Sequence, residues 1–211
     1  LITSSAASDV YKRQALITYL TLYFSNNIYD EIIVDSVFQA VSIGTTSGFL
    51  TSNYSSWPLF VPIMLLIAAF IGACAGSTGG GIKVIRALIL IRQGSSEITK
   101  LIHPNAVVTI KFGKKSLDPR VSESVWGFFS VYVATFLIIL MFLLSQNIDF
   151  LSAFSAVGAT LNNLGPGLGI VAENYKNISD PSKLALCMAM LLGRLEIFTL
   201  LLLFTPAFWR N

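Results

Sequence analysis

The sequence predicts an all-α integral membrane protein, in which units of helix, re-entrant pore helix with a filter loop, and helix are repeated around a central pore. Of its 211 residues, 54% are hydrophobic and only 12% are charged, and the mean hydropathy is +0.71. Soluble domains carry about 25% charged residues, so this composition is typical of a chain in a bilayer. The other two observations are a glycine-rich break in an apolar segment and a short apolar run that occurs twice.

Residues 1–14 are polar and match no pattern in the rest of the chain. We interpret them as a non-native, artefactual tail and leave them out of the predicted fold. Residues 15–24 are apolar-rich and would form about 15 Å of helix, which is half a membrane. We interpret this segment as the end of a spanning helix whose beginning is missing.

A short apolar run covers residues 36–43. We expect Asp35 to cap a helix there, and the run is too short to span, so we predict a re-entrant helix that ends at Gly44. Its C-terminus would direct about half a negative charge toward a cation. The extended backbone of residues 45–49 can then present carbonyl oxygens in place of an ion's hydration shell. An ordinary hairpin turn is the alternative for a pattern that occurs once.

The glycine-rich stretch 72–83 separates two apolar segments, 59–75 and 82–91, that are typical of membrane helices. Each glycine costs a helix about 0.8–1 kcal/mol relative to alanine, so we expect the helix to break. Lipid cannot hydrogen-bond a broken backbone, which predicts a polar pathway beside residues 76–81. A loop between two separate helices outside the membrane stays open as an alternative. A phosphate-binding loop is excluded, because Gly81 is not followed by Lys and Ser or Thr.

The pattern of short apolar run and glycines occurs a second time. Asp149 precedes the run 150–160, and the glycine-rich segment 161–169 follows. The filter-like glycines of the two copies are Gly48 and Gly165, and the tetrapeptides Phe-Gln-Ala-Val and Phe-Ser-Ala-Val match within the two runs, with a period near 116 residues. This repetition favours a pore over two hairpin turns.

Two further spanning helices are predicted, one before the second run at 124–145 and one at the end of the chain at 183–204. Arg194 lies near the middle of the last one, where a charge costs about 2.5–3.5 kcal/mol and usually faces the interior of the bundle. Our hypothesis is that carbonyls of residues 76–81 neutralise Arg194 and that both form part of a gate. A side chain that extends to the membrane interface is the alternative.

Basic residues predict the orientation of the chain. The segment 83–123 holds eight of the 14 Lys and Arg residues, so the positive-inside rule makes it cytoplasmic, and both re-entrant helices then enter from outside. Acidic residues at the outer side could concentrate cations, or they could be ordinary solvated loop charges. These residues are Asp30, Glu31, Asp35, Asp149, Glu173 and Asp180.

No residues are available for catalysis or for a resident metal. His103 is the only histidine, Cys74 and Cys187 lie in apolar segments, and Glu196 is the single carboxylate within the predicted membrane helices. We therefore expect no enzyme activity, no cofactor, no metal beyond a transported ion and no nucleic-acid partner.

Four motifs, in this order, resemble the bacterial Trk-type potassium uptake proteins of the Trk/Ktr/HKT superfamily. They are TTSGF (45–49), AGSTGGGIKVIR (75–86), NNLGPGLG (162–169) and MLLGRLEIFTLLLLFTPAFWR (190–210). Members of this superfamily have four pore repeats, and the resemblance, which runs from about Ala15 to the C-terminus, covers the third and fourth only.

The resemblance divides the chain into the tail 1–14, a third-type repeat at 15–91 whose second helix is broken at 72–83, a basic linker at 92–123 and a fourth-type repeat at 124–211. It implies channel-like uptake of K⁺, with membrane lipid around the chain, through a multi-pass protein of the bacterial inner membrane whose linker and C-terminus are cytoplasmic. It also implies a homodimer and a cytoplasmic regulatory subunit that binds nucleotides. An inactive fragment, or a membrane protein of another class without ion flux, is the alternative.

The resemblance assigns roles to three groups of residues. The ion filter takes one segment from each repeat, an intramembrane loop gates the pore from below, and an arginine contacts that loop. The filter residues are Thr46, Ser47, Gly48, Asn163, Leu164 and Gly165, the gate-loop residues are Gly76, Ser77, Thr78, Gly79, Gly80 and Gly81, and the arginine is Arg194.

Overall fold

The computed structural model describes residues 2–25, 31–72, 80–103, 111–112, 115–116 and 118–194. Within these ranges the chain is almost entirely helical, as predicted. Its elements are α1 (Ile2–Phe24), α2 (Ile32–Gly44), the 3-10 helix η1 (Tyr54–Ser56), α3 (Phe60–Ile71), α4 (Val84–Ile102), β1 (Lys111–Phe112), β2 (Lys115–Ser116), α5 (Pro119–Ser145), α6 (Phe150–Leu161), the 3-10 helix η2 (Gly169–Val171) and α7 (Asp180–Arg194).

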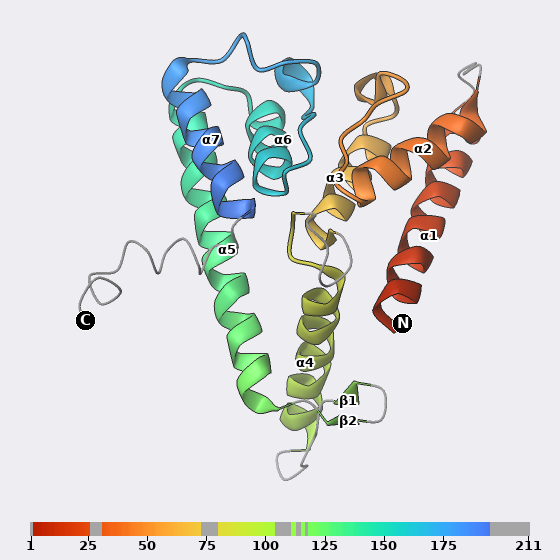
Figure 1. The fold of residues 1–211 in the computed structure, drawn as a ribbon, viewed down its shortest axis with the longest axis vertical. Coiled ribbons are helices and arrows are strands. Elements are labelled where there is room, and N and C mark those ends of the chain that lie inside the picture. Colours follow the sequence, from red (N-terminus) through yellow and green to blue (C-terminus); the bar gives the residue numbers. More distant parts are fainter. Residues whose placement is uncertain are drawn as a thin grey trace.

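The helices form two groups, which correspond to the two predicted repeats (Figure 1). Helices α1, α2 and α3 make up one group, and α5, α6 and α7 make up the other. Helix α4 contacts α5 and runs beside its lower half, away from the short helices α2 and α6. The antiparallel pair β1–β2, which the sequence did not predict, lies at that lower end.

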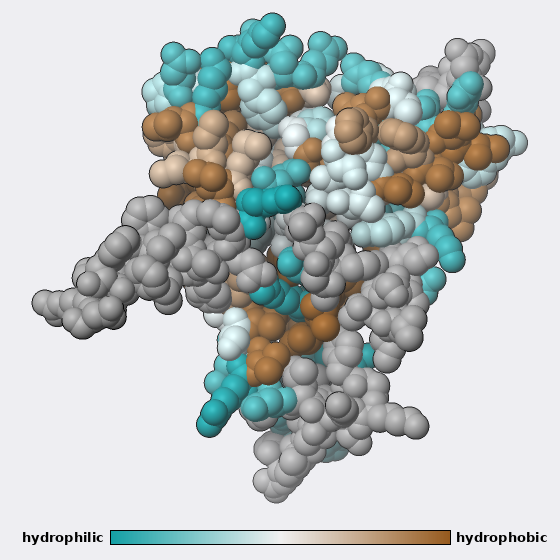
Figure 2. All heavy atoms as spheres, in the orientation of Figure 1, coloured by the Kyte–Doolittle hydropathy of each residue, from teal (hydrophilic) through white to brown (hydrophobic). Residues whose placement is uncertain are grey.

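Helix α5 has the length and composition of a membrane span. Among the described residues it is the one helix that meets both criteria, with a mean hydropathy of 2.5 in its most apolar window, of which only 28% is buried. The core helix of a soluble protein would be mostly buried, so these apolar side chains are suited to lipid or to further helices. In Figure 2, hydrophilic residues lie along the upper edge of the molecule and hydrophobic residues on the flanks below it.

Each group has its own core, and three aromatic rings join the two cores. Phe70 of α3 packs against both clusters, as does Phe154 of α6. The ring centroid of Phe70 lies 6.3 Å from that of Phe154 and 5.6 Å from that of Phe136 on α5. The end of α3, just before the glycine-rich break, is therefore anchored in the second repeat.

The two short helices predicted to enter the membrane only partway, α2 and α6, differ in how their N-termini are capped. The Asp149 carboxylate caps α6, because its Oδ2 accepts a hydrogen bond from the backbone N–H of Ser152 at 3.0 Å. The expectation that Asp35 caps the first such helix is wrong. Helix α2 begins at Ile32 after Glu31, so Asp35 lies within its first turn, where its carboxylate accepts a hydrogen bond from Thr51 at 2.7 Å.

The spanning segments also differ in length from the prediction. Helix α1 runs without a break through most of residues 1–14, so the helix has no boundary at residue 15, and the assignment of that tail as non-native stays a prediction. Helix α3 ends at Ile71 and α4 begins at Val84, which are the limits expected for the break. Helix α4 then continues to Ile102, past the predicted end at Ile91, and α5 begins at Pro119 after an Asp118 cap.

Candidate functional site

Helices α2 and α6 end in the same turn, a Schellman motif. In α2 the backbone N–H of Ser47 donates to the Ser42 carbonyl at 2.9 Å, and in α6 the N–H of Leu164 donates to the Ala159 carbonyl at 2.7 Å. This motif needs one residue in the left-handed region. Thr46, with φ of 58°, takes that place in α2, and Asn163, with φ of 54°, takes it in α6.

The chain then turns through a glycine in both copies. Gly48 has φ of 76° and Gly165 has φ of 103°, which are values that favour glycine over residues with a Cβ. The equivalent positions are 117 residues apart, both from Thr46 to Asn163 and from Gly48 to Gly165. The predicted period near 116, taken from the helices before the turns, is therefore one residue short at the filter. We refer to residues 46–50 as the third filter strand and to residues 163–168 as the fourth.

The two filter strands touch each other. A Cβ added to Gly48 would overlap with the carbonyl oxygen of Leu164, and its third nearest neighbour is Pro166 at 3.4 Å. A Cβ added to Gly165, by contrast, would meet nothing within 4 Å. Gly48 is therefore required for contact between the strands, whereas Gly165 faces open space.

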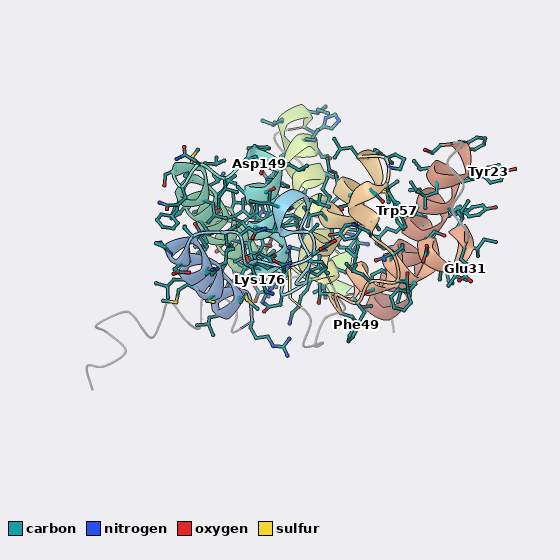
Figure 3. All side chains as sticks on the ribbon, turned by 90° about the horizontal axis from the view of Figure 1, so that it is seen from above. Tyr23, Glu31, Phe49, Trp57, Asp149 and Lys176 are labelled. Carbon is teal, nitrogen blue, oxygen red and sulfur yellow. The ribbon has the colours of Figure 1, made fainter. Side chains whose placement is uncertain are left out.

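A cavity of about 590 Å³ opens between the two filter strands, beside the loop before α7. Gly48 and Gly165 both line it, together with Glu173 and Tyr175 from the loop before α7. Seen from above, Lys176 of the same loop and Asp149 lie over the group of α5, α6 and α7, and Glu31 lies at the other end of the molecule (Figure 3). Because Glu173 lines the cavity, its carboxylate can attract a cation that enters it.

Three of the other described acidic residues on the predicted outer side have structural partners. Asp149 caps α6, and hydrogen bonds from the side chain and then the backbone of Ser152 lower the pKa of its carboxyl. Asp35 accepts the hydrogen bond from Thr51, and Asp180 lies 3.0 Å from the Lys183 ammonium. The negative charges of these three carboxylates are therefore partly compensated by hydrogen bonds or an ion pair within the fold.

The site offers oxygen atoms and a negative potential. In the described part of the chain, no three His, Cys, Asp or Glu residues lie close enough together to hold a metal ion. The oxygen atoms available at the two strands are those of backbone carbonyls and hydroxyls. Helices α2 and α6 both direct their C-termini at the filter strands, and each carries about half a negative charge there. This arrangement suits a monovalent cation that exchanges its hydration shell for carbonyl oxygens.

The end of the glycine-rich break lies against the base of the fourth filter strand. A Cβ on Gly80 would overlap with the Asn162 carbonyl, and one on Gly81 would lie 3.2 Å from the Asn162 side-chain oxygen. The backbone N–H of Ile82 donates to the carbonyl of Phe70 at 2.9 Å, which folds this segment back onto α3. Two of the six predicted gate-loop residues thus contact Asn162, the residue before the fourth filter strand, and Gly76, Ser77, Thr78 and Gly79 lie outside the described residues.

Helix α7 also packs against the junction between α6 and the fourth filter strand. A Cβ on Gly193 would overlap with the carbonyl oxygen of Leu161, the last residue of α6. The side-chain amide of Asn163 donates to the Met190 carbonyl at 3.2 Å. Arg194 follows directly and is exposed at the end of the described part of α7. Its predicted contact is with carbonyls of residues 76–81, of which 76–79 lie outside the described residues.

Several residues of the site were not predicted. The side chain of Asn162 is fully buried, and its Oδ1 accepts a hydrogen bond from the Tyr132 hydroxyl at 2.7 Å. Tyr54 and Tyr175 donate to carbonyls of the fourth filter strand. Among the site residues that were not predicted, only Gly193 has a local signal in the sequence, because it is a glycine next to a charged residue in an apolar helix.

These features define a class: membrane proteins of the pore-loop type, in which re-entrant helices hold a cation filter. The chain belongs to the TrkH family of cation transport proteins, whose family model matches residues 21–211. The predicted family is thereby confirmed. The fold class is confirmed as well, because a crystal structure of the potassium transporter TrkH from Vibrio parahaemolyticus superposes with a TM-score of 0.87 at 51% identity, covering 95% of this chain and 43% of that one.

Two relatives show how much of such a protein the chain represents. It is 52% identical over 199 residues to the Trk system potassium uptake protein TrkH of Salmonella typhimurium and 51% identical over 199 residues to that of Escherichia coli K12. Both alignments cover 93% of this chain and 41% of the relative. The chain thus spans about two fifths of the length of these curated relatives.

Proposed function

We propose that this chain forms two filter strands of a channel-like pore for the uptake of potassium ions. The observation that carries the proposal is the repeated filter turn at Gly48 and Gly165, whose strands meet at one outer cavity. Relatives named as potassium uptake proteins share about half of the aligned residues. K⁺ is therefore the proposed cargo, with carbonyl oxygens of Thr46, Ser47, Gly48, Asn163, Leu164 and Gly165 as its filter.

The gate in this proposal is the loop 76–81, below the filter. Gly80 and Gly81 lie against Asn162, so a displacement of the loop would act directly on the base of the fourth filter strand. Arg194 is proposed to hold the loop closed through its carbonyls. We expect Arg194→Ala to raise the basal cation flux and to weaken its control. Unchanged flux and control in that variant would remove Arg194 from the gate.

The proposed location is the bacterial cytoplasmic membrane, with residues 92–123 and the C-terminus in the cytoplasm. Support comes from the separation of the basic linker, at the lower ends of α4 and α5, from α2 and α6 near the upper edge (Figure 1). A homodimer and a cytoplasmic nucleotide-binding subunit are the proposed partners, and the exposed basic side chains of Arg92 and Lys100 on α4 are on the side where that subunit would bind.

Uptake of radioactive Rb⁺ tests the proposal. A full-length chain that carries this segment is expressed in cells deficient in potassium uptake, as the wild type, as Gly48→Ser and as Gly165→Ser. Gly94→Ser is the matched control, because a Cβ at Gly94 on α4 meets nothing within 4 Å. We expect uptake by the wild type and the control, and either loss of uptake or entry of Na⁺ in both filter variants.

Wild-type transport by both filter variants, at normal amounts in the membrane, would reduce the two loops to hairpin turns. Expression of residues 15–211 alone, beside the full-length chain, tests the remaining alternative. Uptake by the full-length chain but not by residues 15–211 would identify this segment as an inactive part of the transporter.

A further inference from the structure

Two tyrosine hydroxyls from different elements bind the backbone of the fourth filter strand. The hydroxyl of Tyr175, in the loop before α7, donates to the Gly165 carbonyl at 2.7 Å. The hydroxyl of Tyr54, in η1 of the other repeat, donates to the Gly167 carbonyl at 2.8 Å, with the Pro166 carbonyl at 3.3 Å. Alternate carbonyls of one filter strand are thus bound by side chains from two other elements.

Both tyrosines have fixed positions. Only 2% of Tyr54 is exposed, within the core of α1, α2 and α3. Tyr175 packs against the core of α5, α6 and α7. Burial raises the pKa of Tyr175 to about 12, so its hydroxyl keeps its proton, and remains a donor, at any pH at which cells live.

The third filter strand is held in a different way, by side chains of its own pore helix. The hydroxyl of Ser42 donates to the Phe49 carbonyl at 2.7 Å, and the side-chain amide of Gln39 donates to the Ser52 carbonyl at 3.2 Å. In the fourth strand, the hydroxyl of Ser155 on α6 accepts at 2.8 Å from the backbone N–H of Leu168, which belongs to the same peptide group as the Gly167 carbonyl. Tyr54 and Ser155 together hold the peptide group after Gly167, and Tyr175 holds the carbonyl of Gly165.

Gly165 is the position where this dependence matters most. Its φ of 103° and the open space beside its Cα leave the torsions of Gly165 itself little restricted. The ring of Pro166 fixes the torsion on the far side of the next peptide bond, and the Tyr175 hydrogen bond acts on the freedom that remains to the Gly165 carbonyl. A filter discriminates between K⁺ and the smaller Na⁺ through the number and the orientation of its carbonyl dipoles. A carbonyl whose orientation is less restricted would fit the two ions more equally.

We propose that Tyr54 and Tyr175 are specificity-determining positioning residues, whose hydroxyls fix the carbonyls of Gly167 and Gly165 and thereby favour K⁺ over Na⁺. The inference rests on the proposed function. Tyr54 has a second consequence, because it belongs to the third repeat and binds a carbonyl of the fourth. It makes the geometry of one filter strand depend on the fold of the neighbouring repeat.

The test uses Tyr54→Phe, Tyr175→Phe and the double variant in the full-length chain, since phenylalanine removes only the hydroxyl and retains the packing. Tyr23→Phe is the matched control, because Tyr23 lies on α1 and is 61% exposed. Rb⁺ uptake and Na⁺ uptake are measured with the amount of protein in the membrane. We expect each single variant to lower the preference for Rb⁺ over Na⁺ by about threefold to tenfold, the double variant to lower it further, and Tyr23→Phe to leave it unchanged.

A wild-type ratio of Rb⁺ to Na⁺ uptake in all three variants would overturn the inference. So would a loss of uptake that follows the amount of protein while the ratio stays constant, because that result describes a structural role only. Both results require that the wild type transports Rb⁺. Absence of Rb⁺ uptake by the wild type would instead overturn the proposed function, and the inference with it.

Discussion

The hydroxyl of Tyr132 donates a hydrogen bond to the side-chain oxygen of Asn162 at 2.7 Å, in the fully buried region where α5 passes the end of α6. The Asn162 amide donates in turn to the Gly158 carbonyl at 2.7 Å. Asn162 is thus held from two sides, while its backbone carbonyl is in contact with Gly80. The spanning helix, the fourth filter strand and the glycine-rich break meet at this one side chain.

Tyr132→Phe should therefore destabilise the protein. The substitution leaves the buried oxygen of Asn162 without its donor, and an unsatisfied buried acceptor costs about 1–3 kcal/mol. Thermal unfolding of the full-length chain in detergent measures the effect. Ser130→Ala is the control on the same helix, because the Ser130 hydroxyl is exposed and bonds only to the backbone of its own helix. Equal stability of the two variants would contradict the role of Asn162.

Gly193→Ala and Gly94→Ala should have effects of opposite sign. At Gly193 the new methyl group would overlap with the Leu161 carbonyl, so α7 must move, at a cost of about 1–3 kcal/mol. At Gly94 it meets nothing within 4 Å, and alanine favours the helix by about 0.5–1 kcal/mol. Melting temperatures of the two variants test this pair. A stable Gly193→Ala protein would show that α7 does not press on the end of α6.

Thr46→Asn should stabilise the third filter strand. Thr46 is a β-branched residue at φ of 58°, in a conformation that costs an ordinary side chain about 1–2 kcal/mol. Asparagine tolerates this conformation and occupies the equivalent position, Asn163, in the other copy. We expect the free energy of unfolding to rise by about 1 kcal/mol. A fall in stability would indicate that the threonine side chain makes contacts that outweigh its strain.

Asp149→Ala should cost about 1 kcal/mol of stability, because it removes the N-cap of α6. The pKa of Asp149 is lowered in the folded protein, so its carboxylate stabilises the fold above the ordinary value of 3.8. That contribution is lost as the pH falls through the lowered folded pKa. Asp149→Asn keeps an acceptor and should remove this dependence on pH. Unfolding measured between pH 6 and about pH 3 distinguishes the three proteins, and identical pH profiles would exclude the cap as the cause.

Glu173→Gln should slow uptake of Rb⁺ most at low ionic strength. The carboxylate lines the outer cavity and raises the local concentration of cations, an attraction that salt screens over about 10 Å at 0.1 M. We expect a reduction of about twofold to fivefold at low salt that disappears at high salt. Asp180→Asn is the control, since Asp180 is paired with Lys183. Equal effects of the two substitutions would assign the change to net charge alone.

The elements that carry their own local signal were predicted well from the sequence. The helix break was predicted because a run of glycines disfavours a helix, and α3 ends at Ile71 and α4 begins at Val84. The prediction of a cap at Asp35 was wrong, because the apolar residues before it continue the helix back to Ile32. Helix α4 was predicted to end at Ile91, where the apolar run ends, yet it continues with polar residues that its contact with α5 supports.

Contacts between distant segments could not be read from local patterns. Tyr54 and Gly167 are separated by 113 residues, and neither has a neighbour in sequence that points to the other. Asn162 likewise looked like one polar residue of a glycine-rich loop, although it is the point where α5 and the break meet. These pairings follow from how the two repeats pack, which the order of motifs along the chain does not specify.

Three glycines from different parts of the chain, Gly48, Gly80 and Gly193, lie on the backbone carbonyls of Leu164, Asn162 and Leu161. Even alanine would overlap at each of these positions, so no single substitution provides a small step away from the present arrangement. Natural variation at this junction is thereby restricted to the residues around it. The tyrosines, loop charges and helix surfaces around the junction can change without moving the backbone, whereas a side chain at any of these three glycines requires a backbone shift.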